Sequence, residues 1–84
     1  MHLNHRELRV FLSIARAGSI NAAAERIGMT QPALSRSLRR LEETLGAPLF
    51  DRHAGGMSLT DFGKTLRRHG EMMEFETSRV VEEI

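Results

Sequence analysis

The amino-acid sequence predicts a mainly α-helical domain with three short helices, a small β-hairpin and one long C-terminal helix. Three observations lead to this prediction. Apolar residues recur at intervals of three and four over most of the chain, which is the spacing of one helix face. Glycines at positions 18, 28 and 46 follow three of these periodic segments and are placed to end them. The segment 49–59, LFDRHAGGMSL, instead has two short apolar ends around a Gly-Gly pair, which favours a hairpin.

The first two helices are expected between Asn4 and Gly28. Asn4 and Glu7 have the spacing of a helix N-cap and its reciprocal partner. The apolar stripe that follows consists of Leu8, Phe11, Leu12 and Ala15. Ser19 is expected to cap the second helix, whose alanines 22–24 favour helix and allow close approach by a neighbour.

The third helix is expected over residues 31–45. Thr30 is its predicted cap, and Pro32 is tolerated because amides of the first turn have no intrahelical partner to lose. Leucines at 4-3-4 spacing form its buried stripe: Leu34, Leu38, Leu41 and Leu45. Gly46 stops the helix, and Pro48 prevents an immediate restart.

The last helix is expected to begin at Thr60 and Asp61 and to run to the C-terminus, with Gly63 and Gly70 weakening it. One face carries an apolar stripe of Phe62, Leu66, His69, Met73, Val80 and Ile84. Phe62 and Leu66 are expected to dock on the core, but the rest of the stripe lies too far along the helix to be covered. An exposed stripe of this kind usually pairs with another helix, so we expect a homodimer through residues 62–84.

Charge is unevenly distributed along this chain of 84 residues, which suffices for one small domain. The net charge is +1, but residues 1–53 hold eight arginines against five acids and residues 54–84 hold four basic residues against six acids. Four arginines and no acid lie between Arg26 and Arg40. A solvated helix face would usually intersperse both signs, so this segment indicates a site for a polyanion.

With the leucine stripe turned inward, the outward side of the third helix carries Pro32, Arg36, Arg39, Arg40 and Glu43, with Gln31 and Ser35 beside them. Only Gly28, Met29 and Thr30 link this helix to the preceding one, which predicts a helix-turn-helix over about residues 20–39. In a DNA major groove, glutamine pairs with adenine, arginine pairs with guanine, and an apolar edge contacts the thymine methyl group. Acids would be repelled by DNA, which accounts for Glu42 and Glu43 at the far end. The hairpin is then a wing, with Arg52 and His53 able to reach the backbone or the minor groove.

The segment GSINAAAERIGMTQPALSRSLRRLEETLGAPLFDRHAGGMSLTDFG resembles the N-terminal DNA-binding domain of LysR-type transcriptional regulators. The matching residues are Gly18-Ser19, Ala23-Ala24, Gln31-Pro32-Ala33, Ser35-Arg36, Leu41-Glu42, Leu45-Gly46, Leu49-Phe50, Arg52, Leu59-Thr60 and Gly63. Two positions depart from the family pattern: Phe62 stands where a small residue is usual, and Asp51 places an acid beside Arg52.

The resemblance implies a bacterial winged helix-turn-helix over residues 1–59, with its wing at about 49–59, followed by a linker and dimerisation helix over 60–84. It implies sequence-specific binding of double-stranded DNA by a homodimer on an interrupted palindrome. Gln31, Pro32, Ser35 and Arg36 match positions that face bases, and Thr30 and Arg52 match positions that contact the backbone or a groove. Family members continue into an effector-binding domain, so we expect this chain to be an isolated DNA-binding fragment.

Other functions have weaker support in the sequence. No cysteine is present, and His2 and His5 straddle a helix start without a nearby acid cluster, so we expect neither a metal nor a cofactor. No set of residues is oriented as a catalytic triad, so the chain is not expected to be an enzyme. The lack of a membrane span or signal peptide predicts a cytoplasmic, nucleoid-associated protein. The alternative is a helical interaction module whose basic face binds an acidic protein. RNA binding lacks the exposed aromatics needed for stacking.

Overall fold

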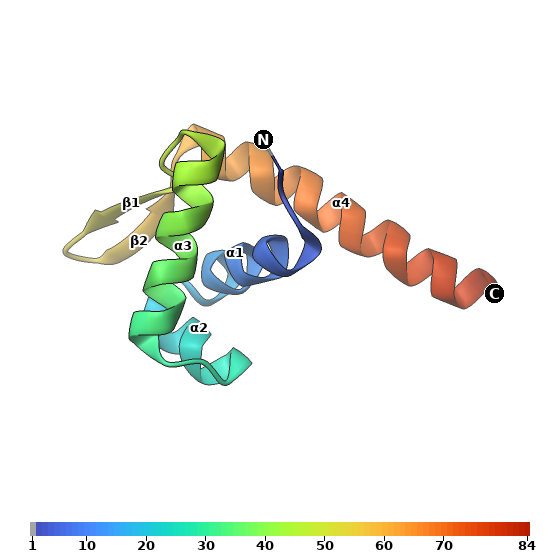
Figure 1. Cartoon of the computed structure of the whole chain (residues 1–84), viewed down its shortest axis with the longest axis horizontal. Helices are drawn as coiled ribbons and strands as arrows, with labels where there is room; N and C mark the ends of the chain where they lie inside the picture. The colour runs from blue at the N-terminus through green and yellow to red at the C-terminus, as the bar shows by residue number, and fades with distance from the viewer. Residues whose placement is uncertain (1) are drawn as a thin grey trace.

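The computed structural model describes residues 2–84 and confirms the mainly helical fold. The elements follow one another as α1 (His5–Ala17), α2 (Ile20–Ile27), α3 (Gln31–Leu45), β1 (Phe50–His53), β2 (Gly56–Leu59) and α4 (Asp61–Glu83). α1 is central, because it packs against α2, α3 and α4. The hairpin projects from one end of the molecule and α4 extends from the other (Figure 1), which gives an elongated shape of 45 × 26 × 21 Å.

The predicted helix boundaries are confirmed by their caps. The Asn4 side chain accepts a hydrogen bond from the Glu7 amide at 2.8 Å, and the Glu7 carboxylate accepts one from the Asn4 amide at 3.3 Å. Ser19 caps α2, and Thr30 caps α3 in the same manner. The glycines that end α1, α2 and α3 all have positive φ angles near 70–78°, a conformation that disfavours residues with a Cβ atom.

The hydrophobic core combines the predicted stripes of the first three helices with two residues at the base of the hairpin. Its buried members are Leu8, Phe11, Leu12, Ile14, Ile20, Ala23, Ala24, Leu34, Leu38, Leu41, Leu49 and Phe50. The rings of Phe11 and Phe50 lie 5.4 Å apart at an interplanar angle of 43°, a favourable tilted arrangement. The core therefore ties the start of the wing to α1.

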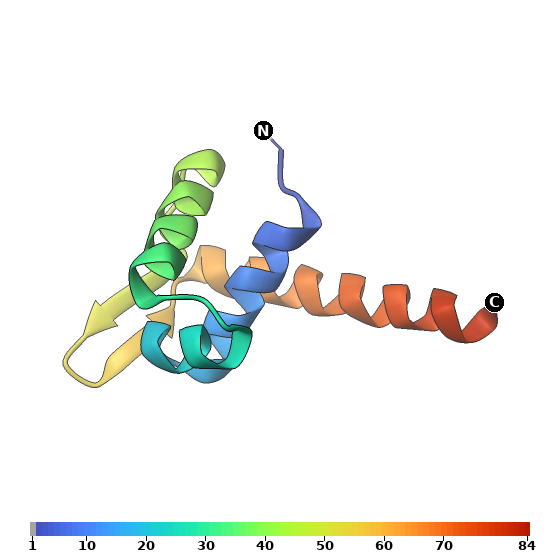
Figure 2. The same cartoon turned by 60° about the horizontal axis from the view of Figure 1, so that its bottom comes forward.

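The wing is an antiparallel hairpin of two four-residue strands. Its register pairs Phe50 with Leu59 and His53 with Gly56. The expected turn at Gly55-Gly56 is displaced by one residue: Ala54 and Gly55 form the loop, and Gly56 begins β2 with a φ of 124°. In Figure 2 the hairpin projects to the side of α3 opposite to α4.

Two glycines allow α4 to lie close to the rest of the domain. Gly63 and Gly70 are both buried. A Cβ atom at Gly63 would overlap the Leu49 carbonyl oxygen, and one at Gly70 would lie 2.9 Å from the Leu8 side chain. Arg16 on α1 adds an ion pair of 2.8 Å to Glu74. Both glycines, expected only to weaken the helix, are therefore its points of contact with the domain.

One expectation for α4 is wrong. Leu66 packs partly against the core as predicted, but the Phe62 side chain is 60% exposed and does not dock inward. The close approach at Gly63 brings the helix axis near Leu49, and the adjacent Phe62 is directed to one side of this contact. Within the described residues, none of the helices is long and apolar enough to span a membrane.

We predict opposite outcomes for alanine at the two buried glycines. Overpacking costs about 1–3 kcal/mol, and alanine in a helix returns up to about 1 kcal/mol relative to glycine. Gly63→Ala collides with a backbone carbonyl that is held in place, so it should lower the free energy of unfolding by about 2 kcal/mol. Gly70→Ala meets only the ends of leucine side chains and should change it by less than about 1 kcal/mol. Urea denaturation measures both, and equal effects would contradict the proposed role of the Leu49 contact.

Candidate nucleic-acid interface

The link between α2 and α3 has the compact geometry that the sequence predicted. The Met29 amide donates to the Ala24 carbonyl at 3.1 Å, which closes the turn after α2. Ala24 is 5% exposed and Leu34 is fully buried, and both belong to the core between the packed helices. The burial of the Leu34 face determines which side of α3 is turned away from the core.

The outward side of α3 is polar and cationic along most of its length. Gln31, Pro32, Arg36, Arg39 and Arg40 are exposed, and Ser35 is half-buried beside them. The Thr30 hydroxyl is exposed but already accepts a hydrogen bond from the Ala33 amide at 3.2 Å. All the candidate residues of α3 therefore lie where a ligand outside the domain can reach them.

Ion pairs divide the arginines of the domain into two groups. Every salt bridge among residues 2–84 involves Arg16, Arg67 or Arg79, and each has its acidic partner on α4. The arginines of α3 and the wing have no carboxylate within 4.0 Å in this part of the chain: Arg36, Arg39, Arg40 and Arg52. The cationic groups beside the predicted recognition helix are therefore available to an anion.

The wing presents Arg52 and His53 on β1, and both are exposed. Arg52 lies opposite Met57 and Asp51 lies opposite Ser58 in the register of the hairpin. Because successive side chains in a strand point to opposite faces, Asp51 is directed away from the face that carries Arg52. The acid beside Arg52 therefore does not neutralise it.

The relation of the wing to α3 depends on a residue whose role the sequence analysis missed. The Glu42 carboxylate accepts a hydrogen bond of 2.6 Å from the Leu49 amide. The Leu49 carbonyl accepts one of 3.1 Å from the Thr60 amide, and the Thr60 hydroxyl donates to the Pro48 carbonyl at 2.7 Å. Glu42 thus anchors the segment between α3 and the wing. This structural role is separate from the expectation that acids lie at the far end of α3 because DNA repels them. The sequence shows Glu42 one turn before Gly46, but only the structure shows that it is half-buried and that it reaches the Leu49 amide.

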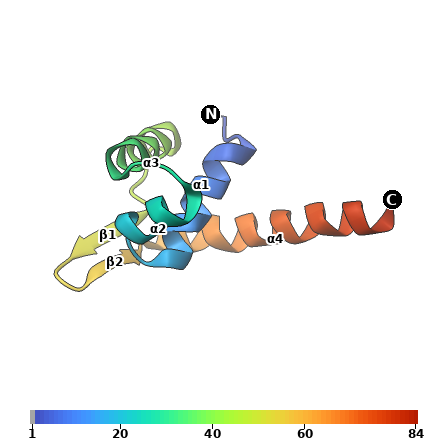
Figure 3. The ribbon, with the colours of Figure 1, turned by 90° about the horizontal axis from the view of Figure 1, so that it is seen from below.

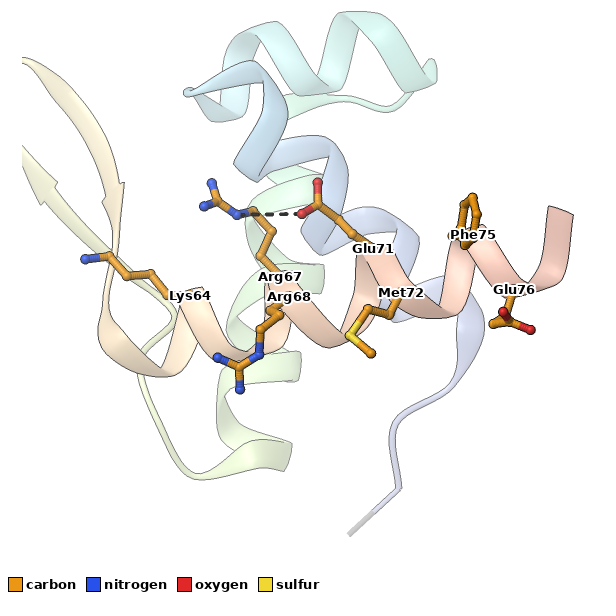
Figure 4. Close-up of a pocket in the computed structure, with 7 residues that line it drawn as sticks. All are labelled: Lys64, Arg67, Arg68, Glu71, Met72, Phe75 and Glu76. Atoms are coloured by element: carbon orange, nitrogen blue, oxygen red, sulfur yellow. Dashed lines mark ion pairs between the residues drawn. The ribbon is translucent and has the colours of Figure 1, made fainter. Parts of the chain in front are cut away.

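The outer surface of α4 carries two separate apolar regions. The stripe predicted as a dimer interface is largely exposed, with Phe62 at 60%, Met73 at 52% and Val80 at 53%. Leu66 is half-buried, whereas His69 and Ile84 are exposed. A second region, around Met72 and Phe75, lines a shallow hollow of about 730 Å³ together with cationic and acidic side chains (Figure 4). Neither Met72 nor Phe75 belongs to the stripe that the sequence predicted.

The histidines are distributed over the surface rather than gathered at one site. Within residues 2–84, no three histidine, aspartate or glutamate side chains are arranged to hold a metal ion. The Nε2 atom of His69 lies 3.5 Å from the Arg68 guanidinium on the same helix.

Comparison with known proteins identifies the family. Residues 5–64 match the family model described as "Bacterial regulatory helix-turn-helix protein, lysR family". The chain belongs to the LysR family. The resemblance noted in the sequence is thereby confirmed, and this LysR-type helix-turn-helix is a DNA-binding domain with a winged-helix fold.

Individual LysR-family proteins agree with this assignment. The small neutral protease regulatory protein of Streptomyces coelicolor A3(2) is 47% identical over 66 residues, which is 79% of this chain and 20% of the relative. The uncharacterised HTH-type transcriptional regulator YybE of Bacillus subtilis 168 is 42% identical over 78 residues, 93% of this chain and 27% of YybE. The chain therefore spans about a fifth to a quarter of these relatives, both of which are named as regulators.

A solved structure provides the corresponding comparison in three dimensions. The complex of the CbnR DNA-binding domain with DNA superposes with a TM-score of 0.85 at 30% identity, covering 96% of this chain and 93% of that one. The agreement includes the winged arrangement, because it extends over nearly the whole of both chains. The predicted fold of this LysR-family domain is thus found in a protein solved on DNA.

We predict that Glu42→Ala loosens the wing. A buried or half-buried hydrogen bond to a charged group contributes about 1.5–3 kcal/mol, and its loss leaves the Leu49 amide without a partner. Thermal unfolding should show that the free energy of unfolding falls by this amount in Glu42→Ala. The control is Glu43→Ala, at the exposed neighbouring position, which should leave the free energy of unfolding nearly unchanged. Amide hydrogen exchange at Leu49 should also accelerate in Glu42→Ala. A variant with unchanged stability and exchange would rule out the anchoring role.

Proposed function

We propose that this domain binds double-stranded DNA sequence-specifically, with α3 in the major groove and the wing against the backbone or the minor groove. The observation that carries the proposal is the row of exposed, unpaired arginines and polar groups on α3 and β1. A helix of this diameter fits a major groove about 12 Å wide. The DNA-binding domain of CbnR, which superposes on this chain, was solved as a complex with DNA, and this supports the proposal that the present domain binds DNA.

Individual residues are proposed to have distinct roles in this complex. Gln31, Pro32, Ser35 and Arg36 face base edges, because they occupy the exposed side of the first two turns of α3. Thr30, at the helix N-terminus, lies beside a phosphate. Arg39 and Arg40, one turn further along, and Arg52 and His53 on the wing interact with the backbone or a groove. Base contacts then supply specificity and backbone contacts supply affinity.

The chain is proposed to divide into a DNA-binding unit, residues 1–59, and a dimerisation helix, residues 60–84. The exposed stripe on α4 supports this division, since apolar residues at helical spacing are normally covered by another helix. We propose that the two copies pack antiparallel, which gives the pair two-fold symmetry.

A two-fold pair implies a two-fold target. Recognition helices related by such an axis enter major grooves about 34 Å apart, or a multiple of that distance, and the DNA sites are inverted repeats. We therefore propose an interrupted palindrome as the binding site of the homodimer. In this proposal the protein acts in the bacterial cytoplasm, associated with the nucleoid when bound. We propose that any small-molecule effector acts through a further domain, since the relatives are several times longer than this chain.

Selection of bound duplexes from a random pool, at a stated salt concentration, tests the proposal. A two-fold-related motif is the expected result. The alternative function, a module whose basic face binds an acidic protein, predicts no preferred sequence, because such a face recognises charge without reading base edges. Recovery of a random pool would therefore contradict sequence-specific binding.

We predict different responses for base-facing and wing residues. Gln31→Ala and Arg36→Ala should weaken binding to the selected site by about 1–3 kcal/mol and affect random DNA much less, because each removes a base contact. Arg52→Ala should weaken binding to every duplex and reduce the slope of log K against log salt by about one. Fluorescence anisotropy titrations on both duplexes measure these effects. Equal losses on both duplexes for Arg36→Ala would show that it contacts only phosphate.

We also predict that one side of α4 forms the homodimer. The double variant Met73→Glu, Val80→Glu places charges in the exposed stripe and should be monomeric in sedimentation experiments. Met72→Glu, Phe75→Glu adds the same charge to the other apolar region (Figure 4) and should dimerise like the wild type. A wild type that remains monomeric at high micromolar concentration, or the opposite behaviour of the two variants, would refute this assignment.

A further inference from the structure

A hollow of about 330 Å³ lies beside α3, away from the wing. It is formed by the first turns of α1, the link before α3 and the middle of α3, and it is lined by Asn4, Arg6, Glu7, Val10, Met29, Ser37 and Arg40. Figure 3 shows the first turns of α1 and the whole of α3 on the same side of the molecule, with α4 on the other side. In all three ribbon views the wing and the start of α1 flank α3 from opposite sides.

The cations of this hollow have no partner within the domain as described. Arg6 and Arg40 are exposed, and neither has a carboxylate within 4.0 Å among residues 2–84. Glu7 also lines the hollow, but its carboxylate accepts the hydrogen bond from the Asn4 amide that closes the capping box. An adjoining hollow of about 230 Å³ shares Arg6 and adds Arg9. The two hollows are thus lined by three arginines and by one acid, Glu7, which already has a structural role.

We propose that Arg6 and Arg40, with the Ser37 hydroxyl, bind a phosphate of the DNA strand on the side of α3 opposite to the wing. This inference rests on the proposed function. A helix in a major groove is bordered by a phosphate backbone on each side. The wing lies toward one of these backbones, and the start of α1 is the element positioned to meet the other. Guanidinium groups suit this contact because their planar N–H donors match the oxygens of a phosphate.

An acidic protein segment is the competing occupant of the hollow. Val10 and Met29 contribute an apolar part to its lining, which such a segment could cover. Two observations favour DNA. Arg40 lies on the same helix as the residues proposed to face bases, and the first turns of α1, which supply Arg6, lie on the same side of the molecule as that helix (Figure 3). The docking that places α3 in a groove therefore brings this hollow to the backbone.

Salt titrations of Arg6→Ala test the proposal on both the selected duplex and a random one. A phosphate contact contributes about 0.9 to the salt slope, which corresponds to a roughly eightfold loss of affinity at 0.1 M salt. We expect this loss on both duplexes, a slope lower by about one, and the same result for Arg40→Ala. Arg68→Ala removes an exposed arginine from the outer side of α4 and is the matched control, with affinity and slope expected to be unchanged.

Duplexes with single uncharged methylphosphonates locate the contact. A methylphosphonate at one position, on the DNA strand away from the wing, should weaken binding by the wild type. The same methylphosphonate should not weaken binding by Arg6→Ala any further. Arg6→Ala with the slope and methylphosphonate profile of the wild type would overturn the phosphate contact and leave the acidic protein as the occupant. Failure of the proposed function can be told apart from failure of this inference. A wild type that binds all duplexes equally would contradict sequence-specific binding. The effect of Arg6→Ala on the random duplex would still test the phosphate contact.

Discussion

The arrangement of the DNA-binding elements depends on the peptide groups of Leu49. The side chain of this residue is buried, its amide is held by Glu42 at the end of α3, and its carbonyl is held by Thr60 at the start of α4. The absence of a side chain at Gly63 lets α4 lie against the same carbonyl. A buried peptide unit left without hydrogen bonds is costly, so these contacts favour a single geometry. Leu49 thereby positions the recognition helix, the wing and α4 relative to one another.

Electrostatics serves two different purposes in this domain. On α4, Arg67 and Arg79 are paired with glutamates, and the pair of Arg16 with Glu74 connects that helix to α1. On α3, on the wing and at the start of α1, the arginines are unpaired among the described residues. Unpaired like charges add nothing to folding stability, and exposed pairs add little. A polyanionic ligand explains why the unpaired arginines are grouped on α3, the wing and the start of α1. The net charge of only +1 does not reveal this grouping.

Much of the fold and the outline of the candidate site could be predicted from local patterns. The Asn4–Glu7 box, the Ser19 and Thr30 caps and the three glycines that end helices each act within a few residues, so sequence spacing is sufficient to locate them. The leucine stripe of α3 determines its outward side by periodicity alone, which identified Gln31, Arg36 and Arg39. The one-residue shift of the turn to Ala54-Gly55 arose because pairing across the strands, rather than the presence of two glycines, selects the register.

The helices, their ends, the exposed face of α3 and membership of the family were therefore accessible from the sequence, because they depend on short spacings and on a specific set of residues. The structure was needed for the anchoring role of Glu42 and for the close contacts at Gly63 and Gly70. It was also needed for the outward position of Phe62 and for the hollow that Arg6 and Arg40 both line. Each of these joins residues that are distant in the chain or depends on how closely two helices approach. Periodicity specifies which side of a helix is apolar, but it carries no information about the distance and angle at which that side meets its neighbour. Those quantities come from packing the whole core.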